Sequence, residues 1–527
     1  MEMKNVPVLI VGGGPVGLTA SILLSQAGVR SLLIERHPGT SVHPKARGIN
    51  ARTMEMYRQI GIEAAIRKAG LPPERAGLIV WSRTLAGEEI ERRVPWRSGP
   101  QSASVSPVRN CLCAQDDLEP VLRGFAEQQT LGEVRFNAEL VSCEQGKDHV
   151  SAIIADHANG GVETKICALY VIAADGSQSR IRRQLGVRML GKENVYDSVN
   201  ILLNADLRPW TAHRPAALYF IENPKMRATF LTINGIDRWG FLVNSLAAYG
   251  YSASDFTPER CGELIREAAG VPDLAVKVLG VAPWTASAHV AEQYRHGRVL
   301  LAGDAAHEMP PTGGFGMNTG VQDVHNLAWK LAAVLQGRAA PSLLDTYHEE
   351  RQPLGRTITE QSLINAVSMG RLSRTNEAAG ARPEYLNEQG MIFGASYTSR
   401  AIVPDGTPPV SVANPVTDYT PSARPGGRAP HVWLHKDVER KSTIDLLGGG
   451  FVLFAGSKGK AWASAGERLG VKCHEIDDQE WADTYGVDEA GAVLVRPDGY
   501  VGWRSASLPG DPVRELTAVM ASIMGRA

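Results

Sequence analysis

The sequence predicts an α/β protein in which a Rossmann-like dinucleotide-binding domain is interrupted by a mixed β-sheet and followed by a separate C-terminal domain. Three observations predict this order. A strand, a glycine-rich turn and a helix open the chain, two later strands end in Gly/Asp pairs, and aromatic and β-branched strands lie between those pairs. The expected parts are the dinucleotide domain in 1–190 and 286–402, the inserted sheet in 191–285, and the C-terminal domain with its linker in 403–527.

The N-terminal segment carries the first motif. It is VPVLIVGGGPVGLTASILLSQAGVRSLLIER, a strand, a G-x-G-x-x-G turn, a helix and a second strand. Gly12 permits the tight turn, Gly14 lets a pyrophosphate approach the backbone, and Gly17 lets the helix pack closely on the strand. Glu35 ends the second strand, where a carboxylate can bind ribose hydroxyls. This motif alone fits NAD and FAD equally. The expected contacts are Gly12, Gly14, Pro15, Val16, Gly17, Glu35 and Arg36.

Two further turns choose between these ligands. One strand ends at Asp175-Gly176 and another at Gly303-Asp304, both far along the chain from the first motif. Two strand-end Gly/Asp pairs, both far from the first glycine motif, indicate one extended ligand touched by three distant segments of the chain. FAD is a ligand of that length, and Asp304 is placed to accept hydrogen bonds from its ribityl or ribose hydroxyls.

The loop after Asp304 has the composition of a flavin contact. Adjacent prolines, ending at Pro311, stiffen the loop, and glycines such as Gly314 and Gly316 let backbone N–H groups approach a flat ring. A long helix is predicted from Met317 to Leu335, and its positive N-terminal end can stabilise negative charge on a reduced flavin.

These motifs carry a family resemblance. The first glycine turn, ADGSQSRIR, and GDAAHEMPPTGGFGMNTGVQDVHNLAWKLA together resemble the FAD-dependent aromatic hydroxylases, the single-component flavoprotein monooxygenases that include p-hydroxybenzoate and phenol hydroxylases. The likeness runs from Val6 to about Arg351 and recurs near the C-terminus. The polyketide-tailoring members, such as the aklavinone and angucycline hydroxylases, are the most similar branch.

The resemblance implies roles for five polar residues. Arg47 would reach the FAD pyrophosphate, Gln115 would contact the cofactor beside it, and Asp304 would bind the ribityl chain. Asn318 would lie by the flavin pyrimidine, and Asp175 would shape the site through which a reduced nicotinamide approaches. Two simpler readings stay open, because Arg47 also fits a surface arginine and Gln115 an ordinary residue at the start of a helix.

The inserted sheet would carry the substrate against the flavin. Its strands include ALYFIENP, so Tyr219 and Phe220 are candidates for the lining, although a tyrosine in a strand also fits plain packing. The catalytic candidates are Pro311, Gly314 and Tyr219. His307 follows Asp304 closely and fits either a base or, more simply, a structural hydrogen bond.

Prolines and glycines after Val403 indicate a linker and a domain boundary. The following β/α order resembles the thioredoxin-like C-terminal domain of the phenol-hydroxylase branch. The sequence has no C-x-x-C pair, so packing or support of a homodimer is expected there rather than redox chemistry.

The family resemblance implies the chemistry. NADPH, with NADH left open, would reduce FAD, O₂ would add to give a C4a-hydroperoxide, and this would hydroxylate a small phenolic or polyketide ring. Oxidative decarboxylation and Baeyer-Villiger-type oxygen insertion are alternatives within the same chemistry, and a flavin-binding protein without turnover is an alternative of another class. A flavin halogenase is disfavoured because no W-x-W-x-I-P stretch is present.

Composition narrows the partners. The 527 residues, 43% of them hydrophobic, can bury more than one core, and the formal net charge of -1 gives no concentrated positive field for nucleic acid. The N-terminal apolar run is too short for a membrane span and lacks a signal cleavage site, and the six scattered cysteines have no zinc spacing. We therefore expect a cytoplasmic protein with no metal, membrane or nucleic-acid partner.

Overall fold

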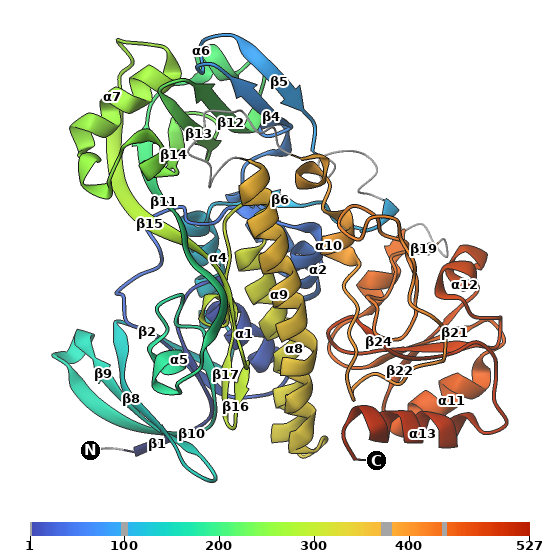
Figure 1. Ribbon diagram of the computed structural model, residues 1–527. Coiled ribbons are helices and arrows are strands. Elements are labelled where there is room, and N and C mark those ends of the chain that lie inside the picture. The colour runs from blue at the N-terminus through green and yellow to red at the C-terminus, as the bar shows by residue number, and fades with distance from the viewer. Residues whose placement is uncertain (1–2, 96–103, 370–381, 435–439, 527) are drawn as a thin grey trace.

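The computed structural model describes residues 3–95, 104–369, 382–434 and 440–526. Two large sheets share the N-terminal part of the chain, and a smaller C-terminal unit lies beside them across the long helices α8 (Gly316–Leu335) and α9 (Asp345–Ser368) (Figure 1). The predicted α/β fold with an inserted mixed sheet is confirmed. Within the described residues no helix is long and apolar enough to span a membrane.

The first sheet is the dinucleotide-binding sheet. Its order is β16-β17-β10-β1-β2-β7, in which β17, β10, β1, β2 and β7 run parallel, and a β8–β9 hairpin extends β10. Val8, Leu9 and Ile10 of β1 are fully buried, as a central parallel strand covered on both faces requires. The strands are β1 (Met3–Val11), β2 (Ser31–Glu35), β7 (Gly132–Phe136), β8 (Ala138–Gln145), β9 (Val150–Asp156), β10 (Val162–Ala173), β16 (Arg295–His296) and β17 (Val299–Leu301).

Helices connect and cover this sheet. The glycine turn leads from β1 into α1, which packs on α8 and on α4. Within α1, Leu18, Ile22 and Leu24 are fully buried. Neighbouring elements cover this helix on nearly every side, and its residues are therefore mostly apolar. The helices of this region are α1 (Pro15–Gln26), α2 (Ala51–Gln59), α3 (Glu63–Ala69), α4 (Gln115–Glu127) and α5 (Arg180–Gln184), and two short strands, β3 (Gly48–Ile49) and β6 (Cys111–Leu112), pair between them.

The second sheet has the order β18-β15-β11-β14-β13-β12-β4-β5. Its centre is antiparallel, but β12 pairs in parallel with β4, which comes from much earlier in the chain. Helix α7 (Pro258–Ala269) covers one face, and the short α6 (Arg208–Thr211) precedes β12. The strands are β4 (Leu78–Ser82), β5 (Glu89–Arg93), β11 (Met189–Asn204), β12 (Ala216–Asn223), β13 (Met226–Thr232), β14 (Arg238–Asn244), β15 (Lys277–Ala291) and β18 (His307–Glu308).

The C-terminal unit has a four-stranded sheet of order β22-β21-β23-β24. Strand β21 is parallel to β22 and antiparallel to β23, and β23 and β24 form a hairpin. The thioredoxin-like assignment of this unit stays a prediction from the resemblance. Helix α10 (Gln389–Phe393) precedes this unit and packs on α2. The elements of the unit are β19 (Trp433–Leu434), β20 (Lys441–Ser442), β21 (Val452–Gly456), α11 (Lys460–Leu469), β22 (Lys472–Ile476), α12 (Gln479–Tyr485), β23 (Ala492–Val495), β24 (Val501–Ser505) and α13 (Pro512–Ile523).

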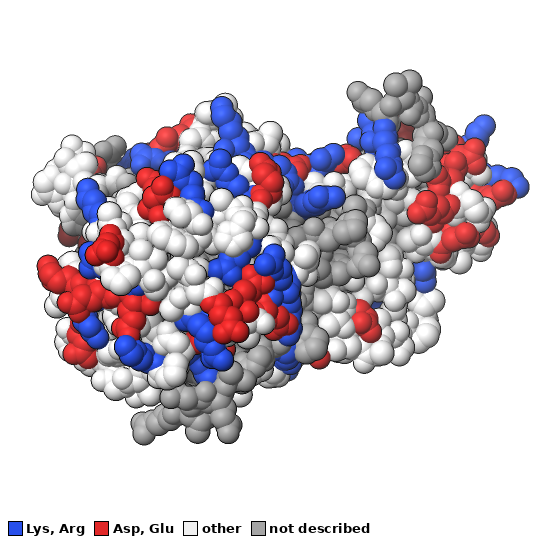
Figure 2. Space-filling model, turned by 90° about the horizontal axis from the view of Figure 1, so that it is seen from above, with Lys and Arg blue, Asp and Glu red and all other residues white. Residues whose placement is uncertain are grey.

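The surface carries both signs of charge. On the face seen in Figure 2, lysine and arginine side chains are interspersed with aspartate and glutamate. Arg400 and Glu349, for example, lie 2.8 Å apart with the Arg400 side chain exposed, and exposed ion pairs contribute little to stability.

A buried ionic cluster joins the C-terminal unit to the long helices. Arg496, in the turn between β23 and β24, donates to both carboxylate oxygens of Glu350 on α9, at 2.7 and 2.8 Å. Lys330 and Asn326 of α8 donate to the same carboxylate at 2.8 and 2.6 Å. Burial opposes ionisation of Glu350, but Arg496 and Lys330 outweigh it and hold its pKa well below the ordinary value. The cluster therefore fixes α8, α9 and the C-terminal turn as one unit.

We expect Arg496→Met to lower the free energy of unfolding by about 3–5 kcal/mol, because the fully buried Glu350 carboxylate would keep only one of its two cationic partners, Lys330. The exposed pair beside it supplies the control, since Arg400→Met should cost less than about 1 kcal/mol. Urea unfolding followed by far-UV circular dichroism measures both. Equal losses in the two variants would show that the buried cluster does not hold the units together.

Candidate active site

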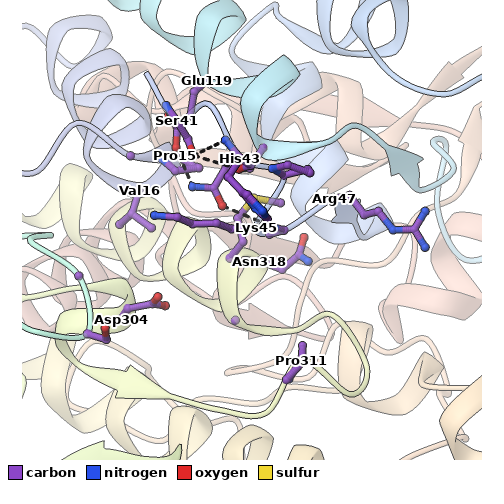
Figure 3. A pocket seen from close by; sticks show the side chains of 18 of the residues that line it. Pro15, Val16, Ser41, His43, Lys45, Arg47, Glu119, Asp304, Pro311 and Asn318 are labelled. Atoms are coloured by element: carbon purple, nitrogen blue, oxygen red, sulfur yellow. Dashed lines mark hydrogen bonds between the residues drawn. The ribbon is translucent and has the colours of Figure 1, made fainter. Parts of the chain in front are cut away.

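One cavity of about 1320 Å³ runs between the carboxyl ends of the first sheet and the open face of the second. Its walls come from the glycine turn, the 35–51 segment, both Gly/Asp turns, the 308–318 loop and the 385–393 segment (Figure 3). Single-ligand pockets have volumes of roughly 300–1,000 Å³. The cavity therefore has room for a long dinucleotide and a second molecule.

The glycine turn forms the narrow end of this cavity. Gly12 has φ +113°, and a Cβ there would lie 2.2 Å from the carbonyl oxygen of Ala174. A Cβ at Gly17 would lie 1.9 Å from the carbonyl oxygen of Gly12, whereas at Gly14 the nearest atom would be 3.9 Å away. Glycine is therefore required at positions 12 and 17 for close packing of the backbone. Gly14 instead leaves open space at the N-terminus of α1, where free N–H groups stabilise an anion.

Glu35 marks the far side of this turn. Its Oε2 accepts a hydrogen bond from the Gly13 N–H at 2.7 Å, and its Oε1 accepts from the His37 N–H at 2.9 Å. These bonds hold the carboxylate at the cavity wall with Arg36 next to it. The position suits a ribose hydroxyl pair.

Val16 joins three of the walls. A Cβ at Gly303, which has φ +61°, would meet the Val16 side chain at 2.9 Å, and a Cβ at Gly320 would meet it at 2.7 Å. Glycine at both positions therefore lets α8 approach the start of α1 and the turn before Asp304. Pro15 begins α1 beside them.

The two aspartates of the Gly/Asp turns both line the cavity. The Asp304 side chain opens into it and is otherwise enclosed by protein, and this desolvation raises its pKa. Desolvation also raises the pKa of Asp175, whose Oδ2 accepts from the Ile181 N–H at 3.4 Å. Its Oδ1 is buried without a hydrogen-bond partner among the described residues. Hydroxyl groups of a ligand would satisfy both carboxylates.

The loop from Pro311 to Asn318 forms the wall opposite the glycine turn. Gly314, with φ +69°, has no atom within 4 Å of an added Cβ, so its backbone is open to a flat ligand. Asn318 is buried and its amide is fully used, because Oδ1 accepts from the Asn50 N–H at 2.9 Å while Nδ2 donates to the carbonyl groups of Gly48 and Gly314. Asn318 thus ties two cavity loops together. Gly316 and Met317 begin α8 and also line the cavity.

Arg47 does not reach toward the pyrophosphate region as expected. Its guanidinium donates to the carbonyl oxygens of Thr232 and Ala217, at 2.7 and 2.6 Å, and turns away from Asp304 (Figure 3). These buried carbonyls at the ends of strands compete successfully for the donors. Lys45 instead extends toward Val16. Lys45 was not among the residues expected from the sequence, although its charge two residues before Arg47 was a usable signal.

Gln115 anchors the segment that carries Lys45. Its Oε1 accepts from the Ala46 N–H at 3.3 Å, and its Nε2 donates to Glu119 at 2.7 Å. Glu119 is buried and also accepts from the Ser41 N–H at 2.6 Å, and burial raises its pKa. Glu119 was not expected from the sequence, because one acidic residue in a helix carries no distinguishing pattern.

Tyr219 lies outside the cavity, contrary to the expectation that it lines the substrate site. It is 1% exposed on the α7 face of the second sheet, and its hydroxyl donates to the Arg214 carbonyl at 2.9 Å. Burial raises its pKa to about 12. Phe220 points to the other face but stacks on Trp81, with ring centroids 5.1 Å apart. Successive side chains of a strand point to opposite faces of the sheet, so a shift of one residue separates the cavity face from the face that carries Tyr219.

The open face of the sheet lines what we call the sheet half of the cavity. Its lining residues are Asn200, Leu218, Leu231, Leu242, Trp284, Tyr385, Glu388, Ile392 and Phe393. Most of this surface is apolar. It suits an aromatic ligand, with few polar groups to orient it.

His307 is structural. Its Nε2 lies 2.8 Å from Oδ2 of Asp323, and both side chains are fully buried. Asp323 also accepts from the Gly303 N–H at 3.1 Å and from Arg351 at 2.8 Å. The network supports the turn that carries Asp304. Within the described ranges no cluster of three or more His, Cys, Asp and Glu residues could hold a metal ion.

The open Gly14, the buried and unpaired Asp175 oxygen, and the helix N-termini of α1 and α8 fit FAD together. The fold and the cavity thus define a flavoprotein. A family model for the FAD binding domain matches residues 5–362, and one for the C-terminal part of aromatic-ring hydroxylases matches residues 422–527. The chain therefore belongs to the FAD-dependent aromatic hydroxylases.

Relatives of known identity match the whole chain. The tetracenomycin B2 monooxygenase-dioxygenase of Streptomyces olivaceus is 40% identical, with 100% of each chain covered. The crystal structure of the flavin-dependent monooxygenase PieE with FAD and substrate has a TM-score of 0.89 at 34% identity and covers 99% of each chain. The ternary complex of aklavinone-11 hydroxylase with FAD and aklavinone has a TM-score of 0.87 at 34% identity, with 100% of each chain covered.

Two glycines of the same motif should respond differently to alanine. We expect Gly17→Ala to unfold or strongly destabilise the protein, because its Cβ would overlap the Gly12 carbonyl. Gly14→Ala should fold with an unchanged melting temperature in the flavin-free state, yet weaken FAD binding about tenfold or more by occupying the space of the pyrophosphate. Flavin fluorescence titration and thermal unfolding measure the two effects. A Gly14→Ala variant that binds FAD as tightly as wild type would contradict this assignment.

The raised pKa of Asp175 gives the flavin-free protein a pH signature. Because the native pKa lies above the unfolded one, the ionised carboxylate destabilises the fold above the native pKa, and this penalty disappears as the pH falls below the unfolded value. Asp175→Asn should therefore raise the melting temperature at pH 8 and give a shrinking gain toward acidic pH.

Asp156 supplies a control of opposite sign. A hydrogen bond from Asn159 lowers its pKa, so its contribution is present above the unfolded pKa and lost in acid. Asp156→Asn should slightly lower the melting temperature at pH 8. A pH-independent effect of Asp175→Asn would show that its carboxyl is not desolvated.

Proposed function

We propose that this chain is an NAD(P)H-dependent monooxygenase that places one oxygen atom of O₂ on the ring of a phenolic or aromatic polyketide substrate, with NADPH as the preferred reductant. One observation carries the proposal: a single continuous cavity joins the FAD-binding turns to the apolar sheet half. An aromatic ring seated on the sheet would meet a flavin held at the loop from Pro311 to Gly316.

The overall reaction balances without an acid or base triad. An aromatic substrate, O₂, NADPH and one proton give the hydroxylated product, NADP⁺ and water. FAD, once bound and reduced, supplies the oxygen-activating chemistry that the family resemblance implies. The protein's own residues bind, orient and exclude water.

Several residues of this chain serve those tasks. The N-terminus of α8, at Gly316 and Met317, presents a positive dipole end to charge on the ring of a reduced cofactor. Pro311 and Gly314 would border the reacting edge, because both line the cavity on that wall and Gly314 is open. Asp304 would bind hydroxyls of the cofactor chain, and Lys45 would take the pyrophosphate charge expected of Arg47.

The sheet half supports a multi-ring substrate. Three leucines, Leu218, Leu231 and Leu242, present a broad apolar surface from neighbouring strands. The names of the similar proteins support this proposal, since one is a tetracenomycin B2 monooxygenase-dioxygenase and another was solved with aklavinone. A homodimer and a cytoplasmic location stay proposals.

The test is NADPH oxidation by FAD-loaded protein with phenols, benzoates and polycyclic quinones, scored by mass spectrometry. We expect one class to accelerate oxidation and to yield a product heavier by one oxygen atom. Decarboxylated or ring-expanded products would favour the alternatives within the same chemistry. Bound flavin without any NADPH oxidation would favour a flavin-binding protein without turnover.

A variant links the activity to the cavity. Asp304→Asn should weaken FAD binding about tenfold, because a charged acceptor becomes a neutral one. The exposed Asp206, which pairs with Arg208 at 2.8 Å, gives the control, and Asp206→Asn should leave both FAD binding and turnover unchanged. Equal flavin affinity in both variants would contradict the placement of the cofactor chain at Asp304.

A further inference from the structure

Asn200 is a polar side chain at the edge of the leucine surface of the sheet half, on the side of β15. It lies on β11 directly opposite Leu242 of β14, in the register that points both side chains into the cavity. The remaining polar side chains of this half, Tyr385 and Glu388, come from the 385–393 segment rather than from the sheet. A ligand that lies flat on the sheet therefore meets one amide in an otherwise apolar surface.

Trp284 fixes which atom of this amide faces the ligand. The indole Nε1 of Trp284 donates to Oδ1 of Asn200 at 2.9 Å. An indole nitrogen is only a donor, so the amide oxygen must face it and the amide Nδ2 must point elsewhere. Among the described residues none accepts a hydrogen bond from that Nδ2, and Asn200 lines the cavity.

The indole is itself held in place. Trp284 packs edge-on against Tyr196 with ring centroids 6.1 Å apart, and it packs against the hydrophobic cluster that Tyr196 forms with Ala286 and with Ala366 of α9. The orientation of the Asn200 amide is therefore set by packing between β15, β11 and α9 before any ligand arrives. Such pre-organisation lowers the cost of forming a hydrogen bond on binding.

We infer that Asn200 donates a hydrogen bond from Nδ2 to an oxygen substituent of the aromatic substrate, a phenolate or a ring carbonyl, and that Trp284 is the positioning residue for that bond. This inference rests on the proposed function. The substrate it names carries an oxygen acceptor on the side of the ring that faces away from the loop from Pro311 to Gly316. A donor at this point favours the ionised form of a phenol, which makes the ring more electron-rich.

The experiment compares two ligands of equal size in the FAD-loaded protein. The probes are 1-naphthol and 1-methylnaphthalene, which differ by a hydroxyl in place of a methyl group, and their dissociation constants are measured by quenching of flavin fluorescence. We expect Asn200→Leu to weaken 1-naphthol about tenfold and to change 1-methylnaphthalene less than twofold, because one hydrogen bond to an oxygen is lost. The absorbance pKa of bound 1-naphthol should rise in the variant.

Two further variants separate donation from shape. Asn200→Asp keeps the size but replaces the donor with a carboxylate, and it should weaken 1-naphthol at least as much as Asn200→Leu. Leu242→Met, on the neighbouring strand, alters the same surface without a donor and should shift both ligands equally.

The positioning role of Trp284 is tested by its effect on the hydrogen bond from Asn200. Trp284→Phe keeps a ring but loses the N–H, and should weaken 1-naphthol by a smaller factor than Asn200→Leu while sparing 1-methylnaphthalene. The double variant should bind 1-naphthol no more weakly than Asn200→Leu alone. A purely structural role for Trp284 would weaken both ligands alike and would add to the Asn200 effect.

Three results would overturn the inference: equal binding of both ligands by the wild-type protein, failure of the wild-type protein to bind 1-naphthol, or equal losses of both ligands in Asn200→Leu. Each is distinguishable from failure of the proposed function, which is scored separately by flavin loading and by the oxygenated product. A monooxygenase that orients its substrate by other groups would pass that assay and fail this one.

Discussion

The carboxylate of Asp323 is the contact on which the cavity depends. It accepts from the backbone of Gly303, from His307 and from Arg351, which brings the turn before Asp304, helix α8 and helix α9 to one fully buried point. Burial opposes its charge, but Arg351 and His307 outweigh it and lower its pKa. A charge buried in this way tolerates little rearrangement, so the turn that presents Asp304 is held firmly.

The same chain of contacts ties the C-terminal unit to the cofactor wall. Arg351 also donates to the Tyr397 hydroxyl at 3.0 Å, and Tyr397 stacks on Tyr500 with centroids 4.0 Å apart. The Glu350 carboxylate beside it binds Arg496. Although it has no C-x-x-C pair, the C-terminal unit thus helps to fix α8, whose N-terminus faces the cavity.

The segment from Ser41 to Arg47 is held differently. Its contacts with Gln115 and Glu119 use backbone N–H groups and a half-buried amide rather than a fully buried ion pair. Arg47 is fixed at the ends of β12 and β13, while Lys45 faces the cavity. A firm frame on one side and a more lightly held segment on the other suit a site that must admit a cofactor and a substrate in turn.

The sequence by itself determined the local backbone: the glycine turn, both strand-end aspartates, the stiff proline loop, the long helix after it and the inserted strands all follow from steric limits and apolar periodicity. The tertiary structure decided which atoms face the cavity. Competing strand-end carbonyls turned Arg47 away, the register of β12 placed Tyr219 in the core behind the sheet, and β4 joined that sheet from far along the chain. These outcomes depend on partners distant in sequence, and no local pattern records the competition between them.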